Sequence, residues 1–452
     1  MTSTTTHPDH PRDQSCKHAA LRYVHPASLT PYGNNARTHS EAQIKQIEES
    51  IKRFGFTNPV LVSDDGEIIA GHGRVRAASA LGLSEVPTLA LSHLTEAERR
   101  AYVIADNKLA ENAGWDAEIL SIELQALNEI DFDLALTGFS LGEIEVVLDG
   151  AGQAQPDPAL NKVDEPAPGP AVTRRGDLWH LGAHRLLCGD ASAASEMAQL
   201  MGEDRAALIF TDPPYNVKID GNVTGLGRQK HREFAVASGE MSREAFTAFL
   251  TSTLSNMASV AADGAIAYVC MDWRHMQELL VAGETALTEL KNLCVWNKTN
   301  AGMGTFYRSK HELVFVFKTG TAAHINSFGL GESGRYRTNV WDYAGANVLG
   351  AARDEALGMH PTVKPVELIV DALKDCSRRG SIVLDGFGGA GSTLIAAESC
   401  GRKARLLEID PHYCDTIIRR YIALTADRDV RNADGERFCD QAAEARGKDQ
   451  SA

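Results

Sequence analysis

The sequence lacks a long apolar run, a surplus of positive charge and a cysteine pattern, and each absence excludes a class of protein. No apolar stretch approaches the roughly 18 residues of a membrane span, and the first residues are polar, so we expect neither a membrane protein nor a secretory signal. The net charge of −15 argues against a general polycation that coats nucleic acid, although it allows a local basic cleft.

The cysteines are not arranged in a recognisable pattern. The eight cysteines are scattered, and no two form a CxxC pair. We therefore expect reduced, buried thiols in a cytoplasmic protein, with neither a disulfide framework nor a zinc site, and we expect no bound metal.

At 452 residues the chain is long enough for two or three domains. Composition predicts a disordered start rich in Thr, His and Pro, and a linker where five prolines and acidic residues occur without periodicity. The predicted parts are a disordered segment at 1–18, a first domain at 19–150, a linker at 151–175, a second domain at 176–428 and a tail at 429–452.

The first domain has a mixed α and β pattern. Apolar residues recur at helical spacing over residues 42–54. Residues 58–62 and 67–70 are typical of two strands joined by the hairpin turn Asp64-Asp65-Gly66. Residues 95–150 are mostly helical by pattern, with expected interruptions at Asn107-Lys108 and Trp115-Asp116.

A glycine-arginine turn, Gly71-His72-Gly73-Arg74, leads into an expected helix at 75–81. This segment resembles the ParB N-terminal domain, a fold shared with sulfiredoxin, in which such a loop binds nucleotide phosphates. His72-Gly73 stands where ParB proteins usually have Glu-Arg, and no sulfiredoxin-type Cys is present, so the resemblance extends to neither nucleotide hydrolysis nor thiol chemistry. Gly71, Gly73 and Arg74 are candidates for phosphate or DNA-backbone contact. The alternative is a helix-start turn with a solvated Arg.

In the second domain, Asp212-Pro213-Pro214-Tyr215 follows the apolar run 206–210, which is typical of a buried parallel strand. Two prolines end the strand at its carboxyl edge, where open α/β sheets bind ligands. The turn offers a carboxylate, a rigid carbonyl and an aromatic ring, which suit the amino group and flat face of a nucleobase. The alternative is an ordinary turn with a capping Asp and a surface Tyr.

A second motif lies at residues 381–410. A short strand precedes the glycine loop 386–391, a helix follows over 392–400, and a second strand ends near Glu408. This arrangement brings backbone N–H groups against a ligand, and Glu408 is placed to bind a ribose hydroxyl pair. Because Gly386-x-Gly388-x-x-Gly391 is also a dinucleotide fingerprint, a nicotinamide oxidoreductase remains an alternative.

Three strings in order resemble the amino-methylating DNA methyltransferases, in the permuted β group: Asp212-Pro213-Pro214-Tyr215, His360-Pro361-Thr362-Val363-Lys364-Pro365 and Asp385-Gly386-Phe387-Gly388-Gly389-Ala390-Gly391. The resemblance covers roughly residues 176–427. It implies a catalytic loop at Asp212 and an S-adenosylmethionine site at the glycine loop. Gly386 replaces the family's usual Pro, which loosens the loop without removing a contacting group.

The resemblance implies an α/β fold, the class I S-adenosylmethionine-dependent methyltransferase fold, with a seven-stranded doubly wound and permuted sheet preceded by a small α+β ParB-like domain. Residues 313–317 are the expected antiparallel strand, and Asp190 follows the strand at 185–188. Asp190 either approaches the cofactor adenine or caps a helix before Ala191. The apolar runs that predict the seven strands are 185–188, 207–210, 265–270, 293–296, 313–317, 382–384 and 405–409.

The resemblance also assigns the site. Asp212 and the Pro213 carbonyl accept the two hydrogens of the target amino group, and Tyr215 stacks on the extruded base, with Pro214 completing the loop. No nucleophilic Cys is required. The cofactor contacts are expected from Phe387, Gly389 and Gly391 at the methionine end, Asp385 at its ammonium, Glu408 at the ribose, and Thr362 and Lys364 at its carboxylate. For Thr362 and Lys364 a simple turn before a helix is the alternative.

The expected partner is double-stranded DNA, and the sequence leaves a homodimer open. Basic residues flank the catalytic strand in a glycine-rich segment at 216–233 and in a basic, aromatic segment at 296–311, and the target-recognition region is expected at 319–359. Because that region is short, we expect the ParB-like domain to help hold the duplex. The candidate DNA contacts are Arg228, Lys230, Arg232, Lys298, Arg308, Arg335 and Arg337.

Three functions from different classes follow. The favoured one is a site-specific DNA methyltransferase acting on adenine N6, because Asp-Pro-Pro-Tyr is commoner in the adenine enzymes of the family and Ser-Pro-Pro-Tyr in the N4-cytosine ones. N4-cytosine methylation is the near alternative. A nicotinamide oxidoreductase leaves the first two strings unexplained, and a partition-type DNA-binding protein with an inactive methylase half leaves the intact motifs unexplained. Neither the recognition sequence nor a paired restriction enzyme can be derived from the sequence.

Overall fold

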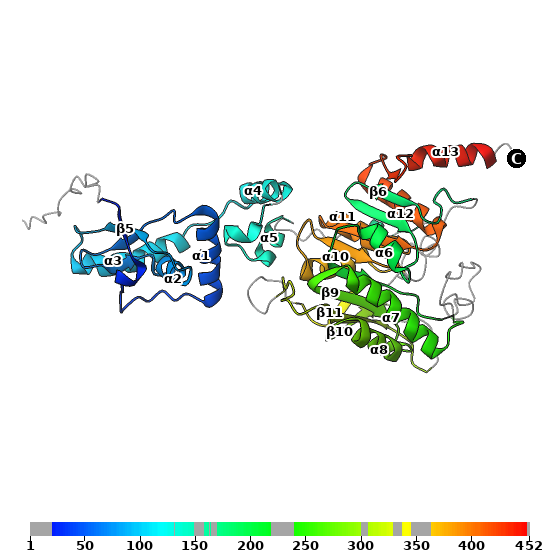
Figure 1. Ribbon diagram of the computed structural model, residues 1–452, viewed down its shortest axis with the longest axis horizontal. Helices are drawn as coiled ribbons and strands as arrows, with labels where there is room; N and C mark the ends of the chain where they lie inside the picture. Colours follow the sequence, from blue (N-terminus) through cyan, green and yellow to red (C-terminus); the bar gives the residue numbers. More distant parts are fainter. Residues whose placement is uncertain are drawn as a thin grey trace, which may run out of the picture. The chain divides into compact units, whose positions relative to one another are not determined.

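The computed structural model describes residues 20–130, 132–148, 158–161, 163, 170–217, 239–299, 306–328, 337–344 and 363–449 (Figure 1). The chain divides into two compact units, Met1–Phe139 and Ser140–Ala452. The predicted disorder at 1–18 and residues 218–233 of the glycine-rich segment, with Arg228, Lys230 and Arg232, lie outside the described residues.

The first unit contains a five-stranded sheet in the order β1-β5-β3-β4-β2. The predicted hairpin is confirmed, because β3 and β4 pair antiparallel on either side of the turn at 64–66. The predicted first helix is also confirmed as α1 (Glu41–Phe54), which begins where the Ser40 side chain accepts the N–H of Gln43. The strands are β1 (Arg22–Val24), β2 (Thr30–Pro31), β3 (Val60–Val62), β4 (Glu67–Ala70) and β5 (Val86–Ala90).

The helices of the first unit are α2 (His72–Ala80), α3 (Glu96–Glu111) and α4 (Ala117–Glu129). The expected interruption at Asn107-Lys108 is wrong. Helix α3 continues through both residues because the Asn107 side chain donates to the Val103 carbonyl 3.0 Å away and leaves the backbone ladder intact. The interruption at Trp115-Asp116 is confirmed, since Asp116 caps the start of α4.

The second unit is built on a ten-stranded sheet. Its central strands β9, β8, β13, β14 and β7 run parallel, so that their carboxyl ends meet at one edge. Strand β11 is antiparallel to both neighbours, as predicted for residues 313–317. The order is β12 (Val340–Tyr343), β10 (Glu289–Lys298), β11 (His311–Lys318), β9 (Ala261–Met271), β8 (Ala206–Thr211), β13 (Ile382–Asp385), β14 (Lys403–Glu408), β7 (His184–Cys188), β6 (Leu178–Leu181) and β15 (Arg431–Asn432).

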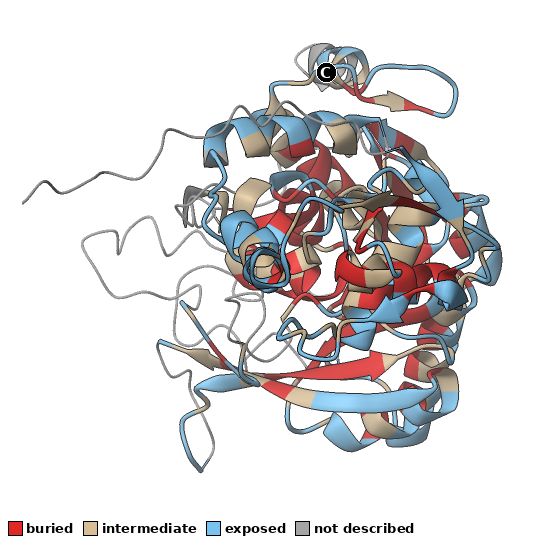
Figure 2. Ribbon diagram, turned by 90° about the vertical axis from the view of Figure 1, so that its left-hand side faces the viewer, coloured by how far each residue is buried: buried red, intermediate tan, exposed pale blue. Residues whose placement is uncertain are grey.

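Helices cover both faces of this sheet, and two hydrophobic clusters fill the space between the layers. Helices α6 (Ala194–Met201), α7 (Arg243–Ser259) and α8 (Met276–Ala286) contribute to one cluster, and α10 (Val366–Cys376), α11 (Ser392–Ser399) and α12 (Pro411–Thr425) to the other. Figure 2 shows buried residues along the strands and exposed residues on the outer helix faces. All seven predicted strands are present, and β6, β12 and β15 extend the sheet, so the α/β doubly wound prediction is confirmed.

Segments at both ends of the second unit pack against its core more firmly than composition suggested. Helix α5 (Leu141–Leu148) places Glu145 2.8 Å from the guanidinium of the fully buried Arg402. Within the segment expected as a linker, Asn161 accepts the N–H of Val366 at the start of α10. Beyond residue 428, β15 pairs with β6, and the buried Phe438 of α13 (Phe438–Asp449) packs edge-on against Trp179. These segments are therefore not free spacers.

None of the helices that the structure describes is long and apolar enough to cross a membrane. None of the cysteines for which a structure is described is in a disulfide, and all of them but Cys439 are buried. They are Cys188, Cys270, Cys294, Cys376, Cys400, Cys414 and Cys439.

Candidate active site

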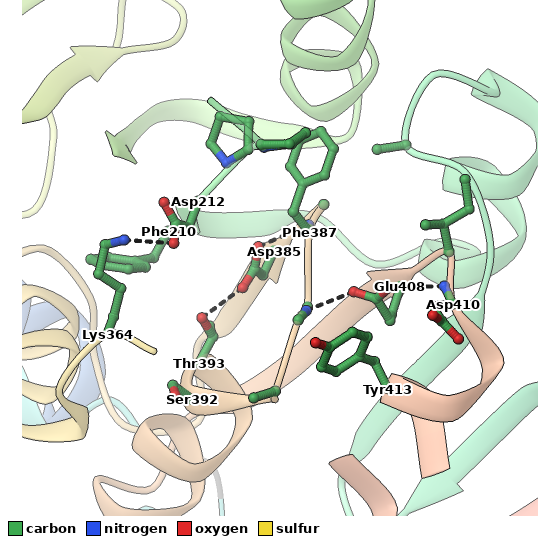
Figure 3. A pocket seen from close by; sticks show the side chains of 18 of the residues that line it. Phe210, Asp212, Lys364, Asp385, Phe387, Ser392, Thr393, Glu408, Asp410 and Tyr413 are labelled. Atoms are coloured by element: carbon green, nitrogen blue, oxygen red, sulfur yellow. Dashed lines mark hydrogen bonds and ion pairs between the residues drawn. The ribbon is translucent and has the colours of Figure 1, made fainter. Parts of the chain in front are cut away.

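A cavity lies at the carboxyl edge of the parallel strands (Figure 3). Asp212 directly follows β8, the glycine loop follows β13, Glu408 is the last residue of β14, and Asp190 lies two residues after β7. All four line the cavity. The fold therefore gathers motifs that the chain keeps far apart. The predicted residues that line the cavity are Asp190, Asp212, Pro213, Pro214, Tyr215, Lys364, Asp385, Phe387, Gly389 and Glu408.

Asp212 lies within a network of charged side chains. Lys364 donates to Asp212 Oδ2 at 2.6 Å, and the Tyr215 hydroxyl donates to Oδ1 at 2.7 Å. Lys364 also lies 2.9 Å from Glu312 Oε2 and 3.1 Å from the Tyr215 oxygen. Glu312 directly precedes the buried run of β11 and is paired on its other oxygen with Lys298. The side chain of Lys364 is only 5% exposed, whereas that of Asp212 is 25% exposed, so the carboxylate reaches the cavity and the ammonium does not reach solvent.

Burial and charge act against each other in this network. Burial raises the pKa of Asp212, and the Lys364 ammonium opposes that rise. Burial alone would lower the pKa of Lys364, but Asp212 and Glu312 outweigh it and raise that pKa. Burial also disfavours the charged form of Glu312, yet Lys364 and Lys298 lower its pKa to about 2. Near neutral pH, Lys364 and Glu312 are therefore both charged.

On the opposite side of the cavity, Asp385 anchors the glycine loop. Its carboxylate accepts the hydroxyls of Thr211 and Thr393 at 2.9 Å and 2.6 Å and the N–H of Phe387 at 3.0 Å. Burial raises the pKa of Asp385 to about 7, although these hydrogen bonds favour the ionised form. Asp385 is thus poised to lose its proton when a cation enters.

Glu408 ends β14 and holds the same loop from the other side. Its two oxygens accept the N–H groups of Gly389 at 2.7 Å and Asp410 at 2.8 Å. Burial raises the pKa of Glu408 to about 7 as well. Glu408 therefore fixes the backbone on both sides of its carboxylate, and the carboxylate lies in the wall of the cavity.

The loop between these carboxylates requires glycine. Gly389 and Gly391 have φ of +50° and +84°. A Cβ on Gly391 would lie 2.9 Å from Ile417 Cγ1, so Gly391 serves the approach of α11 to α12 and does not itself line the cavity.

The structure gives Asp190 a turn-forming contact. Its carboxylate accepts the N–H and hydroxyl of Ser192 at 2.8 Å and 2.7 Å, and α6 begins only at Ala194. The expected helix cap before Ala191 is therefore wrong, and Asp190 still lines the cavity. Thr362 lies outside the described residues.

Of the candidate binding residues outside the cavity, some are held by other groups of the protein and others are exposed. Arg337 is held by Asp375 at 3.0 Å and Asp371 at 3.3 Å, so it stabilises α10. Lys298 points inward to Glu312, whereas Arg308 is exposed. Arg74 donates to the Pro59 carbonyl at 3.3 Å and lies over Gly71, so it supports its own turn, into which Gly73 is buried. Arg335 lies outside the described residues.

Sequence reasoning missed several cavity residues. Glu312 is the most important, and its only signal is a carboxylate at the start of an otherwise apolar run. Thr211, Thr393, Phe249, Asp410 and Tyr413 also line the cavity or hold its carboxylates. In the part of the chain that the structure describes, no group of three or more His, Cys, Asp or Glu side chains is placed to hold a metal ion.

Three family models match the chain: a DNA methylase model over residues 206–419, a ParB-methyltransferase HTH domain over 118–175 and a ParB N-terminal domain over 10–107. The chain is 57% identical over 72 residues to the ParB-like nuclease domain-containing protein YnaK of Escherichia coli strain K12, covering 16% of this chain and 83% of YnaK. It is 26% identical over 263 residues to the DNA adenine methyltransferase YhdJ of the same strain, covering 53% of this chain and 82% of YhdJ.

Among solved structures, the protein TTHA0409 of Thermus thermophilus is 21% identical and has a TM-score of 0.37, covering 54% of this chain and 95% of TTHA0409. The DNA methylase match includes the catalytic string, the Lys364 string and the glycine loop together, whereas a dinucleotide fingerprint accounts for the loop alone. The chain therefore carries an S-adenosylmethionine-dependent DNA methylase domain of the N6/N4 family over residues 206–419, preceded by a ParB N-terminal domain over residues 10–107.

Proposed function

We propose that the chain transfers a methyl group to the exocyclic N6 of adenine in DNA. The observation that carries this proposal is the Asp212 carboxylate, which reaches the cavity at the end of β8 and faces the glycine loop. The Asp form of the catalytic string and the likeness to a relative named as an adenine enzyme favour adenine over cytosine N4. Cytosine N4 remains the second candidate, because its amino group offers the same two hydrogens.

The residues of the cavity fit the cofactor. S-adenosylmethionine supplies an electrophilic methyl group on a sulfonium and also carries an ammonium. Asp385, which is buried and has a pKa near 7, gains a counterion when this ammonium binds, and Glu408, also buried with a pKa near 7, gains hydrogen-bond donors when the ribose hydroxyls bind. The ring centroids of Phe387 and Phe249 lie 6.0 Å apart, and the two rings form an apolar wall. We assign Asp385 to the ammonium and Glu408 to the ribose hydroxyls, with Asp190 near the adenine of the cofactor.

The target amino group needs acceptors because its lone pair is delocalised into the base. Each carboxylate oxygen can accept two hydrogen bonds. Asp212 uses one position on each oxygen for Tyr215 and Lys364, so one position on each remains for substrate. The Asp212 carboxylate and the Pro213 carbonyl would then accept the two hydrogens and favour a more tetrahedral nitrogen. Tyr215 would stack on the extruded base. The carboxylate positions and orients the nitrogen, and no covalent enzyme intermediate forms.

The end of the β10–β11 hairpin supplies a surface for the duplex. A backbone bond from Lys298 N to Lys310 O, 2.9 Å long, closes the hairpin next to Glu312. Beyond this bond, Phe306 is 88% exposed and Tyr307 is 82% exposed. Their rings pack edge-on, with centroids 4.8 Å apart. Residues 296–311 contain no carboxylate, although the whole chain has a net charge of −15. We propose that these rings and the adjoining Arg308 and Lys310 contact DNA beside the target base.

A labelling experiment tests which base is methylated. The full chain is incubated with S-adenosylmethionine carrying a labelled methyl group and with unmethylated DNA of diverse sequence, and the DNA is digested to nucleosides. Label in N6-methyldeoxyadenosine is the expected result. Label in N4-methyldeoxycytidine would keep the family and overturn the choice of base.

A further inference from the structure

Lys364 has no donor left for the cofactor. An ammonium has three N–H donors. Three oxygens surround Lys364 Nζ at hydrogen-bond distance, namely Asp212 Oδ2, Glu312 Oε2 and the Tyr215 hydroxyl. The side chain is 5% exposed, so water does not share these contacts. The sequence-based assignment of Lys364 to the cofactor carboxylate therefore does not fit this geometry.

The network alternates in charge. From the cavity inward it runs Asp212, Lys364, Glu312 and Lys298, contributed by the end of β8, the segment before α10, β11 and β10. Two carboxylates and two ammonium groups balance, so the buried charges compensate one another. Asp212, Lys364 and Glu312 all line the cavity, and the Asp212 carboxylate, at one end of the network, is the most exposed of the three side chains.

We propose that Lys364 and Glu312 are positioning residues for methyl transfer: Glu312 anchors the Lys364 ammonium, and the ammonium holds the Asp212 carboxylate in the orientation in which it accepts the target amino group. This inference rests on the proposed function of Asp212. It assigns a role to Glu312, which no motif marked, and a new one to the lysine of the His-Pro-Thr-Val-Lys-Pro string.

The charges around Asp212 make the inference testable by titration. The groups that face Asp212 are Tyr215 on its own loop, Lys364 before α10, Glu312 on β11, Cys270 on β9 and Asp385 on β13. Lys364 is the cation of this set and favours the ionised form of Asp212, whereas Glu312 is an anion and opposes it. Removing the Lys364 charge should therefore raise the pKa of Asp212, and removing the Glu312 charge should lower it.

The experiment uses the full chain labelled with ¹³Cγ-aspartate, with the Asp212 signal assigned by its loss in Asp212→Asn. Lys364→Met should raise the midpoint of the Asp212 titration by about one pH unit or more, and Lys364→Arg should restore it toward the wild-type value. Glu312→Gln, which preserves shape, should lower the midpoint. The acid limb of the single-turnover methyl-transfer rate should move with each midpoint, while affinity for S-adenosylmethionine stays within about twofold of wild type.

An Asp212 midpoint unchanged in both Lys364→Met and Glu312→Gln would overturn the inference. A rate lowered equally at every pH would do the same, because it would indicate a structural role only. A wild-type chain that transfers no methyl group would contradict the proposed function, while the carbon titration, which needs no activity, would still decide the role of Lys364 and Glu312.

Discussion

The Lys364 ammonium lies 2.6 Å from Asp212 Oδ2, although 152 residues separate the two in the chain. This contact joins two of the three strings that mark the family. It also explains why a buried lysine is tolerated at this place, because Glu312 and Tyr215 take its remaining donors. In our proposal the cofactor is bound by other residues, chiefly Asp385 and Glu408.

Affinity for S-adenosylmethionine should increase as the pH rises from about 6 to about 8. Asp385 and Glu408 have pKa values raised to about 7, so in the free protein each holds a proton part of the time. The cofactor ammonium beside Asp385 and the ribose hydroxyls that donate to Glu408 both favour the ionised carboxylates, so binding expels protons and is favoured at higher pH. Calorimetry across this range, in buffers of different ionisation enthalpy, measures both the affinity and the protons released. Glu408→Gln should reduce both, whereas an affinity independent of pH would contradict the assignment.

Glu145→Gln should lower the free energy of unfolding of the second unit by about 3 kcal/mol, because it removes the charge of a carboxylate that contacts the fully buried guanidinium of Arg402. Chemical denaturation followed by fluorescence measures this loss. Glu143→Gln, an exposed change two residues away in α5, is the matched control and should cost about 0.5 kcal/mol or less. Equal stability of the two variants would show that α5 is not part of the methylase core.

Replacing both Phe306 and Tyr307 by Ala should weaken DNA binding about tenfold, because each exposed ring is expected to stack on a base. The dependence of affinity on salt should stay the same, since no charge is removed, whereas Lys310→Ala should reduce it. Fluorescence anisotropy with labelled DNA at several salt concentrations distinguishes the two effects. Leu290→Ala, at the other end of β10, is the control. Unchanged affinity in the double variant would exclude this surface.

Deleting residues 1–139 should weaken DNA binding and spare binding of S-adenosylmethionine, if the ParB-like domain helps hold the duplex. The cut follows the boundary between the two units and keeps α5 with its Arg402 contact, which a cut at residue 150 would remove. Anisotropy and calorimetry on the truncated chain measure the two affinities, and thermal melting verifies that it is folded. DNA affinity equal to that of the full chain would contradict the role given to the first unit.

Local patterns predicted the sheet well, because apolar runs and glycine loops are set by neighbours in sequence. The seven central strands and the gathering of Asp212, Asp385 and Glu408 at one edge followed from such patterns and from the rule that parallel strands share a carboxyl edge. The antiparallel direction of β11 followed from the resemblance. The resemblance supplied the chemistry of these residues.

What the sequence could not provide were contacts made by the fold. Glu312 is an isolated carboxylate in the chain and gains its partners only when β11 lies beside the catalytic loop. Composition likewise made Arg337 a candidate for DNA, whereas two carboxylates of α10 bind it in the folded chain. A charge has no assigned partner until the tertiary structure is known.

The most direct test of the account is methyl transfer by Asp212→Asn compared with wild type under single-turnover conditions, with S-adenosylmethionine affinity measured in parallel. The amide keeps the shape of the side chain but loses the carboxylate charge and one of its acceptor oxygens. We expect transfer to fall by about 100-fold or more while cofactor affinity stays within about twofold. Transfer at the wild-type rate would show that Asp212 is not the acceptor for the target amino group and would contradict the account.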